Sequence, residues 1–171
     1  MAPPDVRWRR LAGHAIGVAI ALAIGVGRAA AEATHLSADD RKILTTPGAL
    51  VEVRRTDQVP AAVWTAFGNA TADHASTMAN PGEKWQATDY ILEGNLPWRR
   101  LIFAGTSERY VLLYYERGGI AISFHLVLFQ IDGDEARKVW SGGGLPSLQS
   151  LADVPAAIQS PAIQDDPKSA L

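Results

Sequence analysis

The sequence predicts an α+β domain in which an antiparallel β-meander of about five strands packs against helices from the N- and C-terminal parts of the chain. Runs rich in aromatic and β-branched residues follow one another between residues 85 and 141. Gly118-Gly119 and Asp132-Gly133 separate three of these runs, and such pairs are typical of two-residue hairpin turns because they tolerate positive φ. Helical patterns flank the runs on both sides, so we expect a single layer of helices on one sheet.

Capping residues and helical spacing predict the two N-terminal helices. Ser37 is a good N-cap, and Pro47-Gly48 ends the first helix near Thr45. Pro60 suits the first position of a second helix, which continues through an apolar stretch to Phe67. A brief strand is expected between these two helices.

The remaining elements follow in order along the chain. Ser147 is a candidate cap for a closing helix over Leu148–Ile158, which Pro155 limits or kinks. The strands of the meander are predicted at residues 85–92, 98–105, 109–117, 120–131 and 135–141.

Residues 1–33 differ in composition from the rest of the chain. A basic start at Arg7, Arg9 and Arg10 precedes apolar residues, and small residues follow at 29–33. This order is typical of a cleaved secretory signal peptide. Retention as a membrane anchor is the alternative, but the uninterrupted apolar part, 15–27, is shorter than the roughly 20 residues of a spanning helix. We therefore expect a periplasmic or secreted protein with no stable membrane span after signal removal.

Composition limits the function classes of the remaining chain. Removal of 33 of the 171 residues takes away four of 16 basic and two of 18 acidic residues, which leaves a net charge of -4. An acidic domain argues against nucleic-acid binding. The absence of cysteine excludes disulfides, a thiolate nucleophile and iron–sulfur ligation. We expect one α+β domain over residues 34–159 and a flexible tail over 160–171.

The central hairpin predicts a candidate ligand-binding face. If Gly118-Gly119 is a two-residue turn, Tyr114 lies opposite Ser123, and the next turn brings Trp140 opposite His125. This second face is too apolar to be fully exposed to water, so a helix, a ligand or another subunit should cover it. The predicted ligand-binding residues are Tyr114, Glu116, Ser123, His125 and Trp140.

Structural interpretations compete with each chemical one. His125 is better explained as a half-buried histidine of the sheet, and no carboxylate is placed by the sequence to orient it, so no catalytic triad is predicted. The dispersed histidines, at His35, His74 and His125, predict no metal site and no cofactor. Adjacent Arg99 and Arg100 should point to opposite faces, and the inward one needs a carboxylate partner, Glu116 or Glu93.

We therefore expect an exported, non-catalytic module that binds a small molecule or a protein. One alternative is a small hydrolase- or isomerase-like enzyme that uses His125 as an acid or base. The other is a structural domain that assembles as a homodimer through the second sheet face.

Overall fold

The computed structural model describes residues 35–71, 77–90, 94–143, 148–161 and 163–166. The predicted signal peptide and the predicted cap Ser147 lie outside these ranges.

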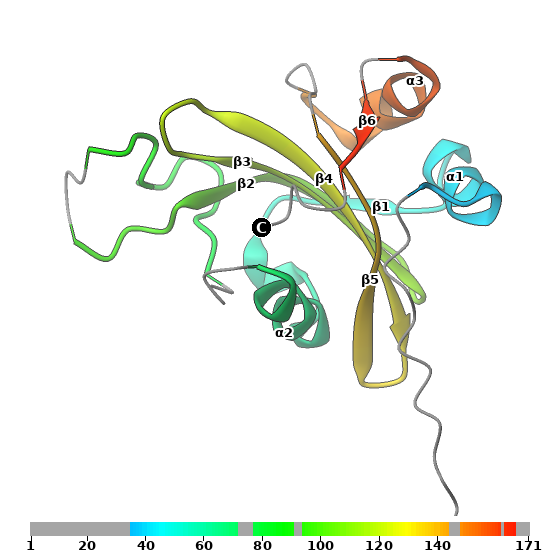
Figure 1. Ribbon diagram of the computed structural model, residues 1–171. Helices are drawn as coiled ribbons and strands as arrows, with labels where there is room; N and C mark the ends of the chain where they lie inside the picture. The colour runs from blue at the N-terminus through cyan, green and yellow to red at the C-terminus, as the bar shows by residue number, and fades with distance from the viewer. Residues whose placement is uncertain (1–34, 72–76, 91–93, 144–147, 162, 167–171) are drawn as a thin grey trace, which may run out of the picture.

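A six-stranded antiparallel sheet, with its strands in sequence order, forms the centre of the fold (Figure 1). It confirms the predicted α+β class and the meander. The first predicted strand, at residues 85–92, is not confirmed. Its described part, 85–90, contains an isolated bridge between Thr88 and Gly119 and no strand. The strands are β1 (Val51–Val53), β2 (Arg99–Thr106), β3 (Tyr110–Arg117), β4 (Ser123–Asp132), β5 (Glu135–Gly143) and β6 (Gln164–Asp165).

The first two helices begin close to the predicted positions, whereas the closing helix predicted from Leu148 is divided into η2 from Leu151 and α3 from Val154. The hydroxyl of Ser37 accepts a hydrogen bond from the backbone N–H of Asp40 at 3.1 Å, which confirms the predicted N-cap. Two short 3-10 turns, η1 before α2 and η2 before α3, complete the helical elements of the described chain. The helical elements are α1 (Ala38–Thr45), η1 (Thr56–Gln58), α2 (Ala61–Ala70), η2 (Leu151–Asp153) and α3 (Val154–Gln159).

Helices cover both faces of the sheet, whereas the sequence predicts a single helical layer. Figure 1 shows α2 on one side and α1 with α3 on the other. The reason is that the central strands are apolar on both faces, so each face needs a cover. Val63 and Phe67 of α2 are fully buried against one face, together with Leu113 of β3. Leu44 of α1 and Val154 of α3 pack on the opposite face.

The register of β3 and β4 also differs from the prediction. Arg117 pairs with Ser123, so residues 118–122 form the connection in place of a two-residue turn. Tyr115 consequently pairs with His125 and not with Ile122. A shift by an odd number of residues turns every side chain of β4 to the other face.

Contacts with a distant segment explain the longer connection. The N–H of Gly118 donates to the carbonyl of Trp98 at 2.9 Å, and a Cβ on Gly118 would lie 2.0 Å from the carbonyl oxygen of Gln86. The chain therefore remains fastened to the segment before β2 after β3 ends. It cannot reverse at the glycine pair.

The β4–β5 turn lies one residue later than predicted. Asp132 pairs with Glu135, which makes Gly133 and Asp134 the turn residues, and Gly133 has a φ of +59°. An irregularity after Leu128 then places Trp140 opposite Leu128 and not opposite His125.

Part of the predicted tail belongs to the sheet. Gln164 pairs with Gly143 in β6, and the N–H of Asp166 donates to the carbonyl of Ser141 at 3.0 Å. Residues 160–171 show no apolar periodicity, which is why the sequence pattern did not indicate a strand there.

We predict that Gly118→Ala lowers the free energy of unfolding by about 2 kcal/mol, as overpacking against fixed backbone does. Urea denaturation measures this loss. Gly94→Ala is the matched control, because a Cβ there meets no atom within 4 Å. Equal stability of the two variants would contradict the close backbone packing at Gly118.

Candidate ligand-binding site

The sheet divides the predicted ligand-binding residues between its two faces. Alternation along β3 directs Tyr114 and Glu116 toward the face that α1 and α3 cover. Trp140 lies on that same face. Ser123 and His125 point to the α2 face, because His125 pairs with Tyr115. The five residues therefore do not form one site.

Tyr114 and Trp140 are buried and hold later parts of the chain in place. The Tyr114 hydroxyl accepts a hydrogen bond from the N–H of Leu148 at 2.9 Å. Burial raises the pKa of this phenol. Trp140 donates its indole N–H to the carboxylate of Asp165 at 2.6 Å, which fastens β6 to the sheet. Both polar groups have structural partners.

Glu116 forms an ion pair with Arg100, the more exposed of the two adjacent arginines. The sequence predicts a carboxylate for the inward arginine, which is Arg99, and its guanidinium lies 5.6 Å from the ring centre of Phe67. A guanidinium nitrogen of Arg100 lies 2.6 Å from the Glu116 carboxylate. The same guanidinium stacks 5.0 Å from the ring centre of Trp85. Through these two contacts, Arg100 connects Trp85, in the segment before β2, with Glu116 of β3.

His125 is a buried, neutral imidazole in contact with a more exposed serine. Its Nε2 lies 2.7 Å from the Ser123 hydroxyl, and its ring stacks on Tyr115 with 5.1 Å between ring centres. Burial, together with the nearby charge of Arg117, lowers the pKa of His125 to about 4. Within the described chain, no group bonds to Nδ1, so the third member of a triad is missing.

An open hollow lies beside α2, and we call it the Trp64 cleft. It has a volume of about 750 Å³ and lies where η1 and the first turn of α2 meet residues 77–78. Aromatic, aliphatic, hydroxyl, amide and carboxylate groups all contribute to its walls. Its lining residues are Thr56, Asp57, Gln58, Val59, Pro60, Ala61, Trp64, Thr77 and Met78.

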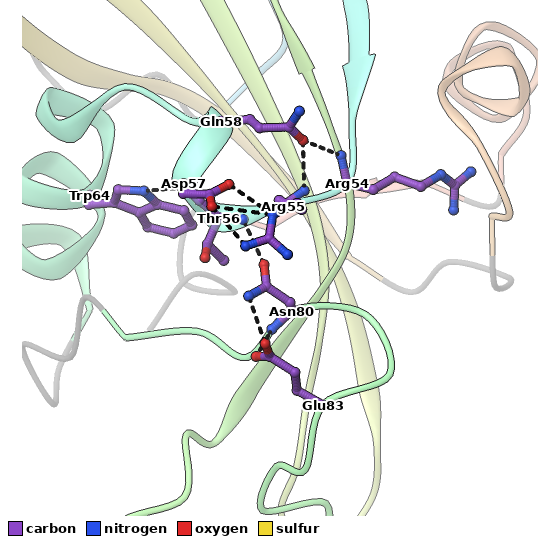
Figure 2. Close-up of polar contacts among 8 residues, drawn as sticks. All are labelled: Arg54, Arg55, Thr56, Asp57, Gln58, Trp64, Asn80 and Glu83. Carbon is purple, nitrogen blue, oxygen red and sulfur yellow. Dashed lines mark hydrogen bonds and ion pairs between the residues drawn. The ribbon is translucent and has the colours of Figure 1, made fainter.

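Side chains hold the irregular loop that forms one wall of the cleft (Figure 2). The side-chain oxygen of Gln58 accepts from the backbone N–H groups of Arg54 and Arg55, at 3.2 and 3.1 Å. The N–H of Thr56 donates to the side-chain oxygen of Asn80 at 2.8 Å. These bonds fix the backbone on both sides of η1, where the short 3-10 turn supplies few hydrogen bonds of its own.

A second set of contacts fixes Asn80 itself. Its amide nitrogen donates to Glu83 at 3.0 Å, and its backbone N–H donates to the other carboxylate oxygen at 2.7 Å. The backbone hydrogen bond from Asn80 lowers the pKa of Glu83. Residues 80–83 and the loop before α2 are thus one connected polar network (Figure 2).

Trp64 is positioned by the same loop. Its indole N–H donates to the carbonyl of Thr56 at 3.1 Å, and its ring packs edge-on against Phe67. The exposed ion pair of Arg55 with Asp57 lies beside it, 2.8 Å between nitrogen and oxygen, and the hydrogen bond from Arg55 lowers the pKa of Asp57. The cleft therefore offers an indole and neutralised charges.

Sequence reasoning missed this cleft because its walls come from separate parts of the chain. Pro60 and Trp64 were visible as the start of an amphipathic helix, but nothing local pairs Thr56 with Asn80. The usable signal is the polar run around Asn80 and Glu83, which the helical and strand patterns leave unexplained.

No family model, no curated protein and no solved structure matches the chain. Among the described residues, no helix is both long and apolar enough to cross a membrane. The same residues contain no group of three or more side chains that could hold a metal ion.

We predict that His125 makes stability fall between pH 6.5 and 4. The native pKa, about 4, lies below the ordinary 6.5, so the unfolded chain takes up a proton that the folded protein resists. The difference amounts to about 3 kcal/mol, present above the ordinary pKa and lost as pH falls toward the native one. Urea denaturation at several pH values measures it.

His125→Gln should flatten the pH dependence in this window. Tyr90→Gln should leave it unchanged, because Tyr90 is 73% exposed to solvent. Two results would contradict the lowered pKa of His125. They are an unchanged pH dependence of the free energy of unfolding in both variants, and His125 ring resonances that titrate near pH 6.5.

Proposed function

We propose that the chain is an exported, non-catalytic binding module and that the Trp64 cleft holds its ligand. One observation carries this proposal: the connection between β1 and α2, whose regular structure is limited to the short turn η1, is fixed by side-chain-to-backbone hydrogen bonds beside an accessible cleft. Export rests on the signal-peptide pattern of residues 1–33.

Pre-organisation is what makes the loop suited to binding. A flexible loop loses conformational entropy when a ligand orders it, and that loss subtracts from affinity. Gln58 and Asn80 already hold the backbone of the loop in one conformation. A ligand that enters the cleft therefore meets a wall that needs little further ordering.

The lining favours a neutral ligand with both an apolar and a polar side. The charges of Arg55 and Asp57 cancel within their ion pair, so the cleft has little net field for a charged molecule. The indole of Trp64 supplies an apolar surface, and the hydroxyl of Thr77 and the amide of Gln58 supply polar groups. Molecules with hydroxyl or amide groups around an apolar face fit this lining.

We do not place the ligand on the second sheet face, which the sequence analysis suggested as a binding surface. Helices of the same chain lie on both faces, and Tyr114 and Trp140 use their polar atoms internally. For this reason we do not extend the proposal to a homodimer formed through that face.

We predict that neutral hydroxylated or amide-bearing fragments bind at the Trp64 cleft. Titration of the labelled protein with a mixed fragment library should shift the indole N–H resonance of Trp64 and the methyl resonance of Met78. Ala61→Trp places a bulky ring at the exposed entrance and should abolish these shifts.

Trp85→Ala is the control for a tryptophan outside the cleft, because Trp85 stacks on Arg100. It should leave the Trp64 shifts intact. Fragments that shift neither Trp64 nor Met78, or that bind the Ala61→Trp protein equally well, would argue against a ligand site here.

A hydrolase is the second candidate, and the contact of Ser123 with His125 favours it. In that reaction the Ser123 oxygen would attack an ester carbonyl and pass its proton to Nε2 of His125. The imidazole would return the proton to the leaving alcohol, and water would then release the acid. The neutral imidazole suits a base, but no described carboxylate orients it.

p-Nitrophenyl acetate tests this second candidate. A hydrolase predicts a burst of p-nitrophenol that both Ser123→Ala and His125→Gln remove, whereas Ser141→Ala retains it. The binding-module proposal predicts that the wild-type protein and all three variants release p-nitrophenol at the same slow rate.

A further inference from the structure

A second hollow lies on the opposite side of the sheet from α2, between the N- and C-terminal helices. It has a volume of about 520 Å³, which is within the range of small-molecule sites. Most of its lining side chains are aliphatic, and we call it the aliphatic hollow. Its lining residues are Ile43, Leu44, Thr46, Pro47, Gly48, Leu50, Glu52, Leu151, Ala152 and Pro155.

The polar side chains of the hollow are already bonded within the protein. One carboxylate oxygen of Glu52 accepts the N–H of Leu151 at 2.7 Å, and the other lies 2.6 Å from the guanidinium of Arg54. The hydroxyl of Thr46 donates to the carbonyl of Lys42 at 2.7 Å. A ligand in the hollow therefore finds apolar contact surface and few available hydrogen-bonding side chains.

Close packing against the sheet shapes the inner part of the hollow. Leu50 and Leu151 reach over Gly105 of β2, where a Cβ would lie 2.8 Å from a methyl carbon of Leu151. The glycine lets both leucines approach the strand. The hollow is consequently lined by methyl groups of Leu50, the residue before β1, and of η2, above a tightly packed floor.

We propose that the aliphatic hollow binds a single unbranched alkyl chain, with the head group of the ligand at the rim. Water in this open hollow finds few hydrogen-bonding partners on the walls, so an apolar chain displaces it favourably. The rim adds little preference for charge, since Arg54 and Glu52 neutralise each other. Its size favours a small ligand over a docked protein, which needs about 1,000 Å² of buried surface.

Titration of the methyl-labelled full chain with 1-hexanol, 1-octanol and octanoate tests the proposal. Shifts should concentrate on the methyl groups of Ile43, Leu50 and Leu151. Each added methylene should tighten binding about fourfold, so 1-octanol should bind about 15-fold more tightly than 1-hexanol. Octanoate should bind within about threefold of 1-octanol, since the rim charges cancel.

Paired tryptophan substitutions locate the site. Ala152→Trp fills the exposed mouth of the hollow and should weaken 1-octanol binding at least tenfold, whereas Ala61→Trp in the Trp64 cleft should not change it. Ala152→Phe provides a smaller obstruction if the tryptophan variant does not fold. The wild-type methyl shifts test the location without any substitution.

Three outcomes would overturn the proposal. They are shifts that avoid the three lining residues, equal affinity for 1-hexanol and 1-octanol, and loss of binding in the Ala61→Trp protein alone. Octanoate that binds more than tenfold more tightly than 1-octanol would overturn the neutral rim. Loss of binding in the Ala61→Trp protein alone would place the alkyl chain in the Trp64 cleft. The other outcomes leave the proposal for that cleft unchanged, so failure at one site is distinguishable from failure at the other.

Discussion

The attachment of Gly118 to the segment before β2 determines how the rest of the sheet is arranged. The hydrogen bond from Gly118 to Trp98, and the absence of room for a Cβ beside Gln86, prevent the chain from turning directly after β3. Because side chains alternate along a strand, the length of this connection decides which residues of β4 face α2. It places His125 beside Tyr115 and on the opposite face from Tyr114.

With this register, side chains fill both faces of the sheet, and the open hollows lie at its borders. Phe67 of α2 packs edge-on against Tyr115 on one face, while Tyr114 packs on Phe103 on the other. The hollows then lie where loops and short helices meet, beside Trp64 and beside Leu151. Binding sites commonly lie on loops of this kind, since a packed scaffold can hold irregular loops in a conformation suited to binding.

Local signals in the sequence predict much of the fold. Ser37 starts α1, Pro60 precedes α2, and four strands of the meander occur close to their predicted positions. A partnership of Glu116 with one of the two adjacent arginines was also predicted, but on the ground that the inward arginine needs a carboxylate. The structure buries Arg99 and pairs Glu116 with the more exposed Arg100. The candidate site was not foreseen, since it depends on contacts between residues far apart. The bond from Thr56 to Asn80 and the pairing of Gln164 with Gly143 leave no local pattern.

The register of β3 and β4 is tested most directly by nuclear Overhauser contacts between aromatic rings. The structure predicts contacts between the ring of His125 and the ring of Tyr115, which stack with 5.1 Å between centres. It also predicts contacts between Tyr114 and Phe124. Contacts between the rings of His125 and Tyr114, with none to Tyr115, would show a two-residue turn at Gly118-Gly119 and contradict this account.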